Sequence, residues 1–140
     1  MTESDVAYLA GLIDGEGSIQ YKQYMRQRKG QKKAYPTWSI RLEIAMTDKD
    51  VIKWCYETFN VGHWGERKVK PGKKRQWRWR VSHRDCLEIC MAIWPHVKTK
   101  LHKVEQVIDH YEGYDGLPKN VVDLDHYRLT KKFNWNLHGN

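Results

Sequence analysis

The sequence predicts an α+β fold in which helices alternate with two antiparallel β-hairpins. Apolar residues recur at helical spacing in four segments, and between these segments they alternate with polar residues in two pairs of short stretches. A chain of 140 residues with 40% hydrophobic content suffices for one compact domain with a modest core. We therefore expect the order helix, hairpin, helix, hairpin and two further helices.

The first helix is expected over residues 4–15. Val6, Leu9 and Ile13 recur at helical spacing, Thr2 or Ser4 supplies an N-cap, and Gly17 breaks the pattern. The chain then changes to the alternation of a half-buried strand.

Two alternating stretches predict the first hairpin. In the first stretch, Ile19 and Tyr21 share an apolar face. A lysine-rich loop closed by Pro36 leads to the second stretch, in which Ile40 and Leu42 continue that face. The opposite face of both stretches is polar and basic, so it is expected to face solvent or a polyanion.

The second half of the chain repeats the order of helix and hairpin. A capped helix start is expected at Thr47, followed by Asp48 and Asp50, and this helix is expected to end at Gly62. Residues 64–70 and 76–81 are expected to be strands around a turn at Pro71 and Gly72. The closing elements are a helix that ends at Pro95, a helix that ends near Gly113, and a short helix within 121–129 before a polar tail. We expect one domain over residues 1–113, with 114–140 as its C-terminal extension.

Composition narrows the compartment and the partners. Three cysteines form no secreted disulfide framework, and neither a leader sequence nor an apolar run of about 18 residues is present, so we expect an intracellular chain that is not secreted and has no membrane partner. The net charge of +8, doubled in a two-fold dimer, favours a polyanion as partner.

The first helix contains an unusual stripe of small residues. Ala7, Gly11 and Gly15 recur every fourth residue, although a glycine in a helix interior costs roughly 1 kcal/mol relative to alanine. A bare stripe allows another backbone to approach closely. The sequence leaves open whether that backbone belongs to a second copy of the helix or to the same chain.

Two acidic residues, Asp14 and Glu16, lie where this helix ends. The helix dipole already places partial negative charge there, so a carboxylate is disfavoured unless a cation or a donor compensates it. If two copies of the helix pack about a two-fold axis, the Glu16 carboxylates approach each other and form an oxygen-rich site suited to Mg²⁺.

Residues 8–19, YLAGLIDGEGSI, resemble the LAGLIDADG motif of homing endonucleases. One copy of the motif in a chain of this length resembles the homodimeric members. The resemblance implies an αββαββα core over about residues 5–112, whose strands form a saddle on double-stranded DNA. It further implies an intron-encoded nuclease that cuts a long pseudo-palindromic site and leaves 3′ overhangs, acting wherever its DNA lies: cytoplasm or nucleoid, organelle, or nucleus.

The resemblance also implies roles for individual residues. Glu16 corresponds to the acidic position that binds metal and is catalytic, Asp48 to a polar position that orients water, and Lys100 to an active-site lysine, with Lys98 as the alternative. Mg²⁺ would be the cofactor, with Mn²⁺ as a substitute and Ca²⁺ supporting binding without cleavage. The dimer interface would comprise Ala7, Gly11, Asp14 and Gly15, with a chiefly structural role for Asp14.

DNA reading is assigned to the polar faces of the predicted strands, because a β-ribbon fits the major groove and these side chains suit base edges and phosphates. The residues are Gln20, Lys22, Tyr24, Arg26, Arg28, Ser39, Arg41, Gln76, Arg78 and Arg80.

The alternative function is a protein of the same fold that binds without cutting, either an RNA maturase for its own intron or a DNA-binding regulator. The presence of Glu16, Asp48 and Lys100 favours cleavage over these alternatives. RNA stays open as a secondary partner.

Overall fold

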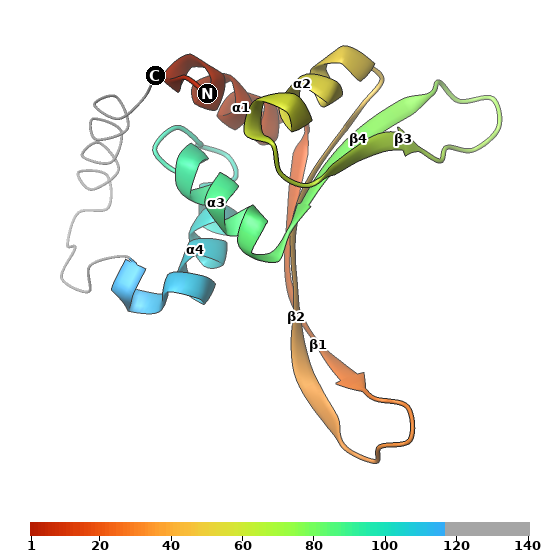
Figure 1. Ribbon diagram of the computed structural model, residues 1–140, viewed down its shortest axis with the longest axis vertical. Coiled ribbons are helices and arrows are strands. Elements are labelled where there is room, and N and C mark those ends of the chain that lie inside the picture. Colours follow the sequence, from red (N-terminus) through yellow and green to blue (C-terminus); the bar gives the residue numbers. More distant parts are fainter. Residues whose placement is uncertain (117–140) are drawn as a thin grey trace.

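The computed structural model describes the backbone of residues 1–116 and the side chains as far as Tyr111 (Figure 1). The elements are α1 (Glu3–Glu16), β1 (Gly17–Gln27), β2 (Ala34–Met46), α2 (Lys49–Phe59), β3 (His63–Arg67), β4 (Gln76–Ser82), α3 (His83–Ile93) and α4 (Leu101–Gly116). The predicted α+β class and the order of the elements are confirmed. The short helix expected within 121–129 lies outside the described residues.

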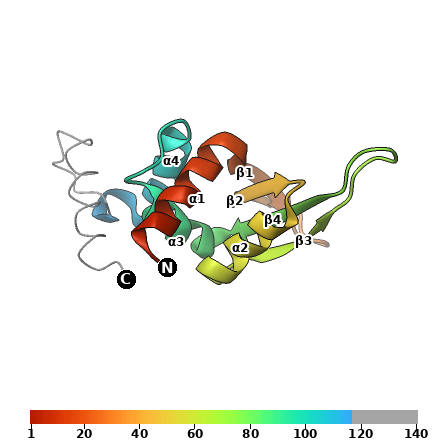
Figure 2. The same cartoon turned by 90° about the horizontal axis from the view of Figure 1, so that it is seen from above.

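The strands form one antiparallel sheet in the order β1-β2-β4-β3, with all four helices gathered on one of its faces (Figures 1 and 2). The covered face supplies the centre of the core, where Leu42, Ile44, Trp79 and Val81 are fully buried. The other face carries the polar residues of the alternation and is not covered by any described helix. The strand period of two therefore separates a packing surface from a solvent surface.

Helix α1 begins and ends at the positions that its sequence signals. Thr2 and Asp5 form a capping box, because the Thr2 hydroxyl accepts from the Asp5 amide and the Asp5 carboxylate accepts from the Thr2 amide. At the other end the chain turns into β1 directly at Gly17, whose amide donates to the Ile13 carbonyl. Glu16 is therefore fixed at the junction of helix and sheet.

Gly17→Ala should destabilise the fold by about 1–3 kcal/mol. A Cβ at this position would lie 2.9 Å from both the Cα and the carbonyl oxygen of Ile13, which is fully buried. Chemical denaturation should show the loss. Gly65→Ala is the matched control, because a Cβ there meets nothing within 4 Å; equal stability losses in the two variants would contradict this assignment.

Several predicted boundaries were wrong. Pro36 does not close the loop but lies inside β2, opposite Met25. A proline is tolerated there because β4 pairs only with residues 41–46 of β2. At Pro36, β2 is therefore an edge strand, and the missing N–H costs no hydrogen bond to β4. β3 ends at Arg67 instead of residue 70. α4 continues to Gly116.

The β1–β2 hairpin extends well beyond the helices (Figure 1). Met25 lies on the side of β1 that carries Ile19, yet it is 64% exposed because none of the described helices covers this part of the hairpin. Beyond the core, both faces of the hairpin are accessible, so it forms an arm with a basic surface.

The three cysteines are free and buried. Cys86 and Cys90 lie one helical turn apart in α3, with their Sγ atoms 4.0 Å from each other. Across residues 1–116, no helix is both long enough and apolar enough to cross a bilayer.

Candidate catalytic centre and nucleic-acid interface

The small-residue stripe of α1 is exposed. A Cβ built on Gly11 or Gly15 would meet no atom within 4 Å, and Ala7 is also exposed. The alternative that the stripe serves a tight contact within the chain is therefore wrong for the described residues. Packing within the described residues therefore does not require glycine at these two positions. A group that packs closely against the stripe would have to come from outside the described part of the chain.

Glu16 is an exposed carboxylate at the negative end of the α1 dipole. No basic residue occupies the last turn of the helix, and no hydrogen bond or ion pair to a described residue engages this carboxylate. Within the described chain, no three His, Cys, Asp or Glu residues gather as a metal site. One copy thus offers a hard oxygen ligand that its own described residues do not complete.

Asp14 connects α1 to the segment that carries the candidate lysines. Its carboxylate accepts from the amide of Lys98 at 2.8 Å and from the amide of Lys100 at 2.9 Å. These charge-assisted bonds hold the loop before α4 against the end of α1. Asp14 therefore positions this loop, and both Lys98 and Lys100 lie next to the helix end that bears Glu16.

Asp14→Asn should lower the stability of the domain by about 2 kcal/mol, because an amide group would replace one accepting oxygen and face a backbone donor. Urea denaturation measures the loss. Asp5→Asn in the exposed capping box at the other end of α1 is the matched control and should cost less. An Asp14→Asn protein as stable as the control would remove the positioning role.

Asp48 lies at the same end of the first hairpin as Glu16. The register pairs Gly17 with Ile44, so the residue before Gly17 and the segment after Met46 continue from the same edge of the β1–β2 pair. Asp48 is the N-cap of α2, and its Oδ1 accepts from the Val51 amide at 3.2 Å. Asp48 is an exposed residue, so its carboxylate is accessible to solvent.

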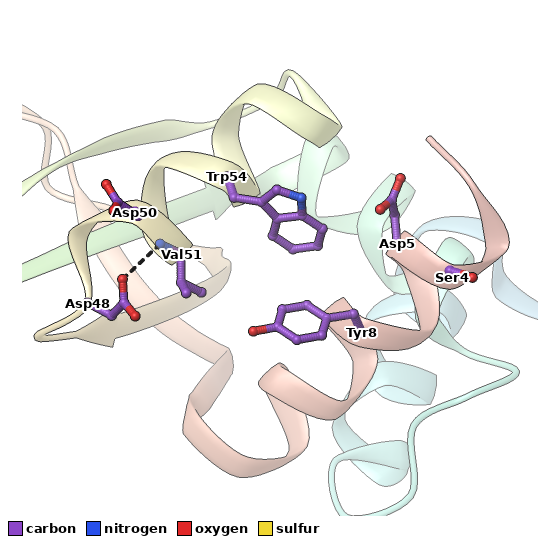
Figure 3. A pocket seen from close by; sticks show the side chains of 7 residues that line it. All are labelled: Ser4, Asp5, Tyr8, Asp48, Asp50, Val51 and Trp54. Atoms are coloured by element: carbon purple, nitrogen blue, oxygen red, sulfur yellow. Dashed lines mark hydrogen bonds between the residues drawn. The ribbon is translucent and has the colours of Figure 1, made fainter.

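A pocket of about 500 Å³ lies between α1 and α2 (Figure 3). Tyr8 and Trp54 line it as a contacting pair, edge to face, with their ring centroids 5.1 Å apart. Asp48 lies on one side of this pair and Asp5 on the other. Tyr8 is 53% exposed and belongs to the same helix as the small-residue stripe. Its ring therefore adds exposed apolar surface beside the stripe.

The uncovered face of the sheet collects most of the residues assigned to DNA. Gln20 pairs with Arg41 and Lys22 with Ser39 across β1 and β2, while Arg78 pairs with Ala45. Opposite charges are scarce on this face: among the residues of the four strands that share it, Glu43 is the sole acid. Such a surface attracts phosphate and offers donors to base edges.

The structure moves one assigned residue and adds others. Arg28 lies in the turn after β1, where its Nε donates to the Tyr35 hydroxyl at 3.1 Å, so it is not a residue of the strand face. His63 and Arg67 of β3 share the polar face with Arg78 and Arg80. The alternation in this five-residue strand was too short to assign them from the sequence.

The sequence matches the profile of LAGLIDADG endonuclease over residues 9–103, which is more than half of the chain. The chain belongs to the LAGLIDADG endonuclease family. The match includes the motif at the end of α1, both hairpins and the loop that Asp14 holds. The family resemblance that the motif indicated is thereby confirmed. No curated protein matches the chain.

Solved structures share the LAGLIDADG fold at low sequence identity. The homing endonuclease I-CvuI, in complex with its target in the presence of calcium, gives a TM-score of 0.62 at 17% identity, covering 97% of this chain and 80% of that chain. The archaeal intron-encoded homing endonuclease I-Vdi141I, complexed with DNA, gives a TM-score of 0.53 at 16% identity, covering 96% of this chain and 98% of that chain.

I-SmaMI, a LAGLIDADG homing endonuclease bound to cleaved DNA, gives a TM-score of 0.54 at 13% identity. The match covers 97% of this chain but only 44% of that chain. The present chain therefore corresponds to about half of that protein. Its length is nearly that of I-Vdi141I, as expected of a LAGLIDADG chain with a single motif.

Proposed function

We propose that the chain is a site-specific homing endonuclease that acts as a homodimer and makes a double-strand break with 3′ overhangs in a long pseudo-palindromic DNA target. One observation carries the proposal: an exposed Glu16, which no described residue compensates, at the end of a helix whose glycine stripe contacts no other described residue. The proposal explains both features together, because close packing of two α1 helices would bring two Glu16 carboxylates to one place.

The packing surface of α1 supports the proposed homodimer. With no Cβ at Gly11 and Gly15, two helix backbones can approach more closely than longer side chains would permit. Tyr8 and the pocket beside Trp54 would flank this contact and supply apolar area. A two-fold axis through the stripe makes the interface self-complementary, as closed dimers require.

The residues present fit a divalent cation of the magnesium type. Glu16 supplies a hard oxygen ligand at a helix end that otherwise has unfavourable charge, and a second copy and a DNA phosphate would add further oxygen ligands. A bound Mg²⁺ would lower the pKa of a water ligand and neutralise the departing 3′ oxygen. Mn²⁺ would substitute, and Ca²⁺ would support binding alone.

The protein's own groups do the rest of the proposed chemistry. The exposed carboxylate of Asp48 orients the attacking water, while its Oδ1 keeps α2 capped. A lysine on the loop that Asp14 holds stabilises charge on the phosphate, with Lys100 favoured and Lys98 as the alternative. No covalent intermediate is involved.

Recognition is assigned to the uncovered sheet face and the arm of the first hairpin. Its strand residues are Gln20, Lys22, Tyr24, Arg26, Ser39, Arg41, Arg67, Gln76, Arg78 and Arg80. The same fold is found bound to DNA targets in I-CvuI and I-Vdi141I. Two copies about a two-fold axis would place two such faces along one duplex, so the target would repeat in inverted form.

The test is to incubate the wild-type chain with a randomised duplex-DNA library, in Mg²⁺ and in EDTA, and to sequence the ends produced. We expect one two-fold-related site with 3′ overhangs in the Mg²⁺ arm only. Equal cutting in EDTA would contradict the metal-dependent mechanism. Selective binding with no cut ends in either arm would replace cleavage by the regulator or maturase function.

A further inference from the structure

Glu43 lies in the middle of the basic face that is proposed to read DNA. Its side chain is only 18% exposed, and it contacts two of the arginines assigned to recognition. Its Oε2 accepts from Nη2 of Arg80 at 3.2 Å, and its Oε1 lies 3.8 Å from Nη1 of Arg78. A carboxylate among phosphate-binding cations lowers general affinity for DNA, so its presence here requires another reason.

The strand register accounts for the contacts. Glu43 in β2 is directly opposite Arg80 in β4, and Arg78 is two residues earlier on the same face of β4, within diagonal reach. Without the carboxylate, the two guanidinium groups would repel each other and spread apart. With it, both guanidinium groups are drawn toward one carboxylate.

Arg78 stands beside a hollow. Its partners in the flanking strands are Ala45 and Gly65, the smallest side chains available, and a Cβ on Gly65 would meet nothing within 4 Å. A pocket of about 280 Å³ is lined there by His63, Gly65, Arg78 and Arg80, together with Trp64 and Glu66. The edge of a base can thus approach the guanidinium groups without displacing a neighbouring side chain.

We propose that Glu43, Arg78 and Arg80 form a guanine-reading subsite, in which Glu43 is the positioning residue that aims the two arginines at the hollow beside Gly65. The ligand is the major-groove edge of a G·C pair, because a planar guanidinium donates two parallel hydrogen bonds to guanine O6 and N7.

The two arginines have different parts in this subsite. Arg80 is the more buried, with 31% of its side chain exposed, and it makes the direct hydrogen bond to Glu43. Arg78 is 40% exposed and makes only the longer contact, so it keeps donors for the base. Arg80 therefore anchors the carboxylate, and Arg78 carries most of the readout. The inference rests on the proposed function as a site-specific DNA-binding protein.

The test compares wild type, Glu43→Gln and Glu57→Gln by binding to the randomised duplex library in EDTA, followed by sequencing of the bound DNA. Glu57→Gln is the matched control, because it removes the same charge from an ion-paired carboxylate on α2, outside the proposed subsite, where Glu57 pairs with Lys53 at 3.7 Å. Melting temperature verifies that each variant is folded.

Wild type should enrich guanine at one symmetric pair of positions. In Glu43→Gln this preference should fall roughly tenfold, while total binding is kept or increased and depends more steeply on salt. Glu57→Gln should keep the full preference, and Arg78→Ala should lose it at the same positions. A Glu43→Gln protein with the wild-type base preference would overturn the subsite alone. A wild type without any base preference would overturn the proposed function, and the subsite with it.

Discussion

Glu16→Gln should reduce DNA cleavage by roughly a thousandfold while leaving DNA binding intact. The amide keeps the shape of the side chain but loses the anionic oxygen that would hold Mg²⁺. Without the metal, the transition state would lose several kcal/mol of stabilisation. Glu16 makes no hydrogen bond or ion pair among the described residues, so the substitution should leave the melting temperature unchanged.

Single-turnover cleavage of the target measures the loss, and binding in EDTA measures the retained affinity. Glu88→Gln is the matched control, because it removes the same charge from an exposed position on a different helix, α3, and should cut at the wild-type rate. A Glu16→Gln protein that cuts as fast as the Glu88→Gln protein would remove Glu16 from the chemistry.

Substitutions at Gly11 should weaken the dimer by roughly a hundredfold or more for valine and by less for alanine. Each dimer contains the change twice, and overpacking a close contact costs about 1–3 kcal/mol per site. The folding stability of the single chain should instead increase in the Gly11→Ala protein. A Cβ at Gly11 meets nothing within 4 Å, and alanine is favoured over glycine in a helix by roughly 1 kcal/mol.

Sedimentation gives the dissociation constant of the dimer, and denaturation below that concentration gives the stability of the single chain. Opposite signs in the two measurements separate a surface contact from damage to the fold. Unchanged association of the Gly11→Val protein would exclude α1 as the dimer interface and would leave the glycine stripe unexplained.

The sequence predicted the elements well wherever local periodicity and end signals agreed. α1 has a capping box at Thr2, a breaker at Gly17 and four buried residues at helical spacing, and its observed bounds fall within one residue of those expected. The two buried strands β2 and β4 were equally clear, because Ile40, Leu42, Trp79 and Val81 mark one face. Boundaries failed where pairing decides them, as at Pro36 and at the end of β3.

The candidate site was predicted only in part, because spatial neighbours do not follow from local pattern. The motif identified Asp14 and Glu16, but the bonds from Asp14 to the amides of Lys98 and Lys100 join residues that are 84 and 86 positions apart. Glu43 was visible as a polar residue in an alternating strand. Its contacts with Arg78 and Arg80 depend on the β2–β4 register, which the sequence does not determine.

In the proposed mechanism, one active site requires two copies of the chain. The most direct test is the initial rate of cleavage of a short duplex carrying the target, measured over chain concentrations from well below to well above the dimer dissociation constant. The two-copy site predicts a rate that rises with the square of the concentration at the low end and becomes linear at the high end. A rate that is linear from the lowest concentration, with a monomeric mass under the same conditions, would contradict it.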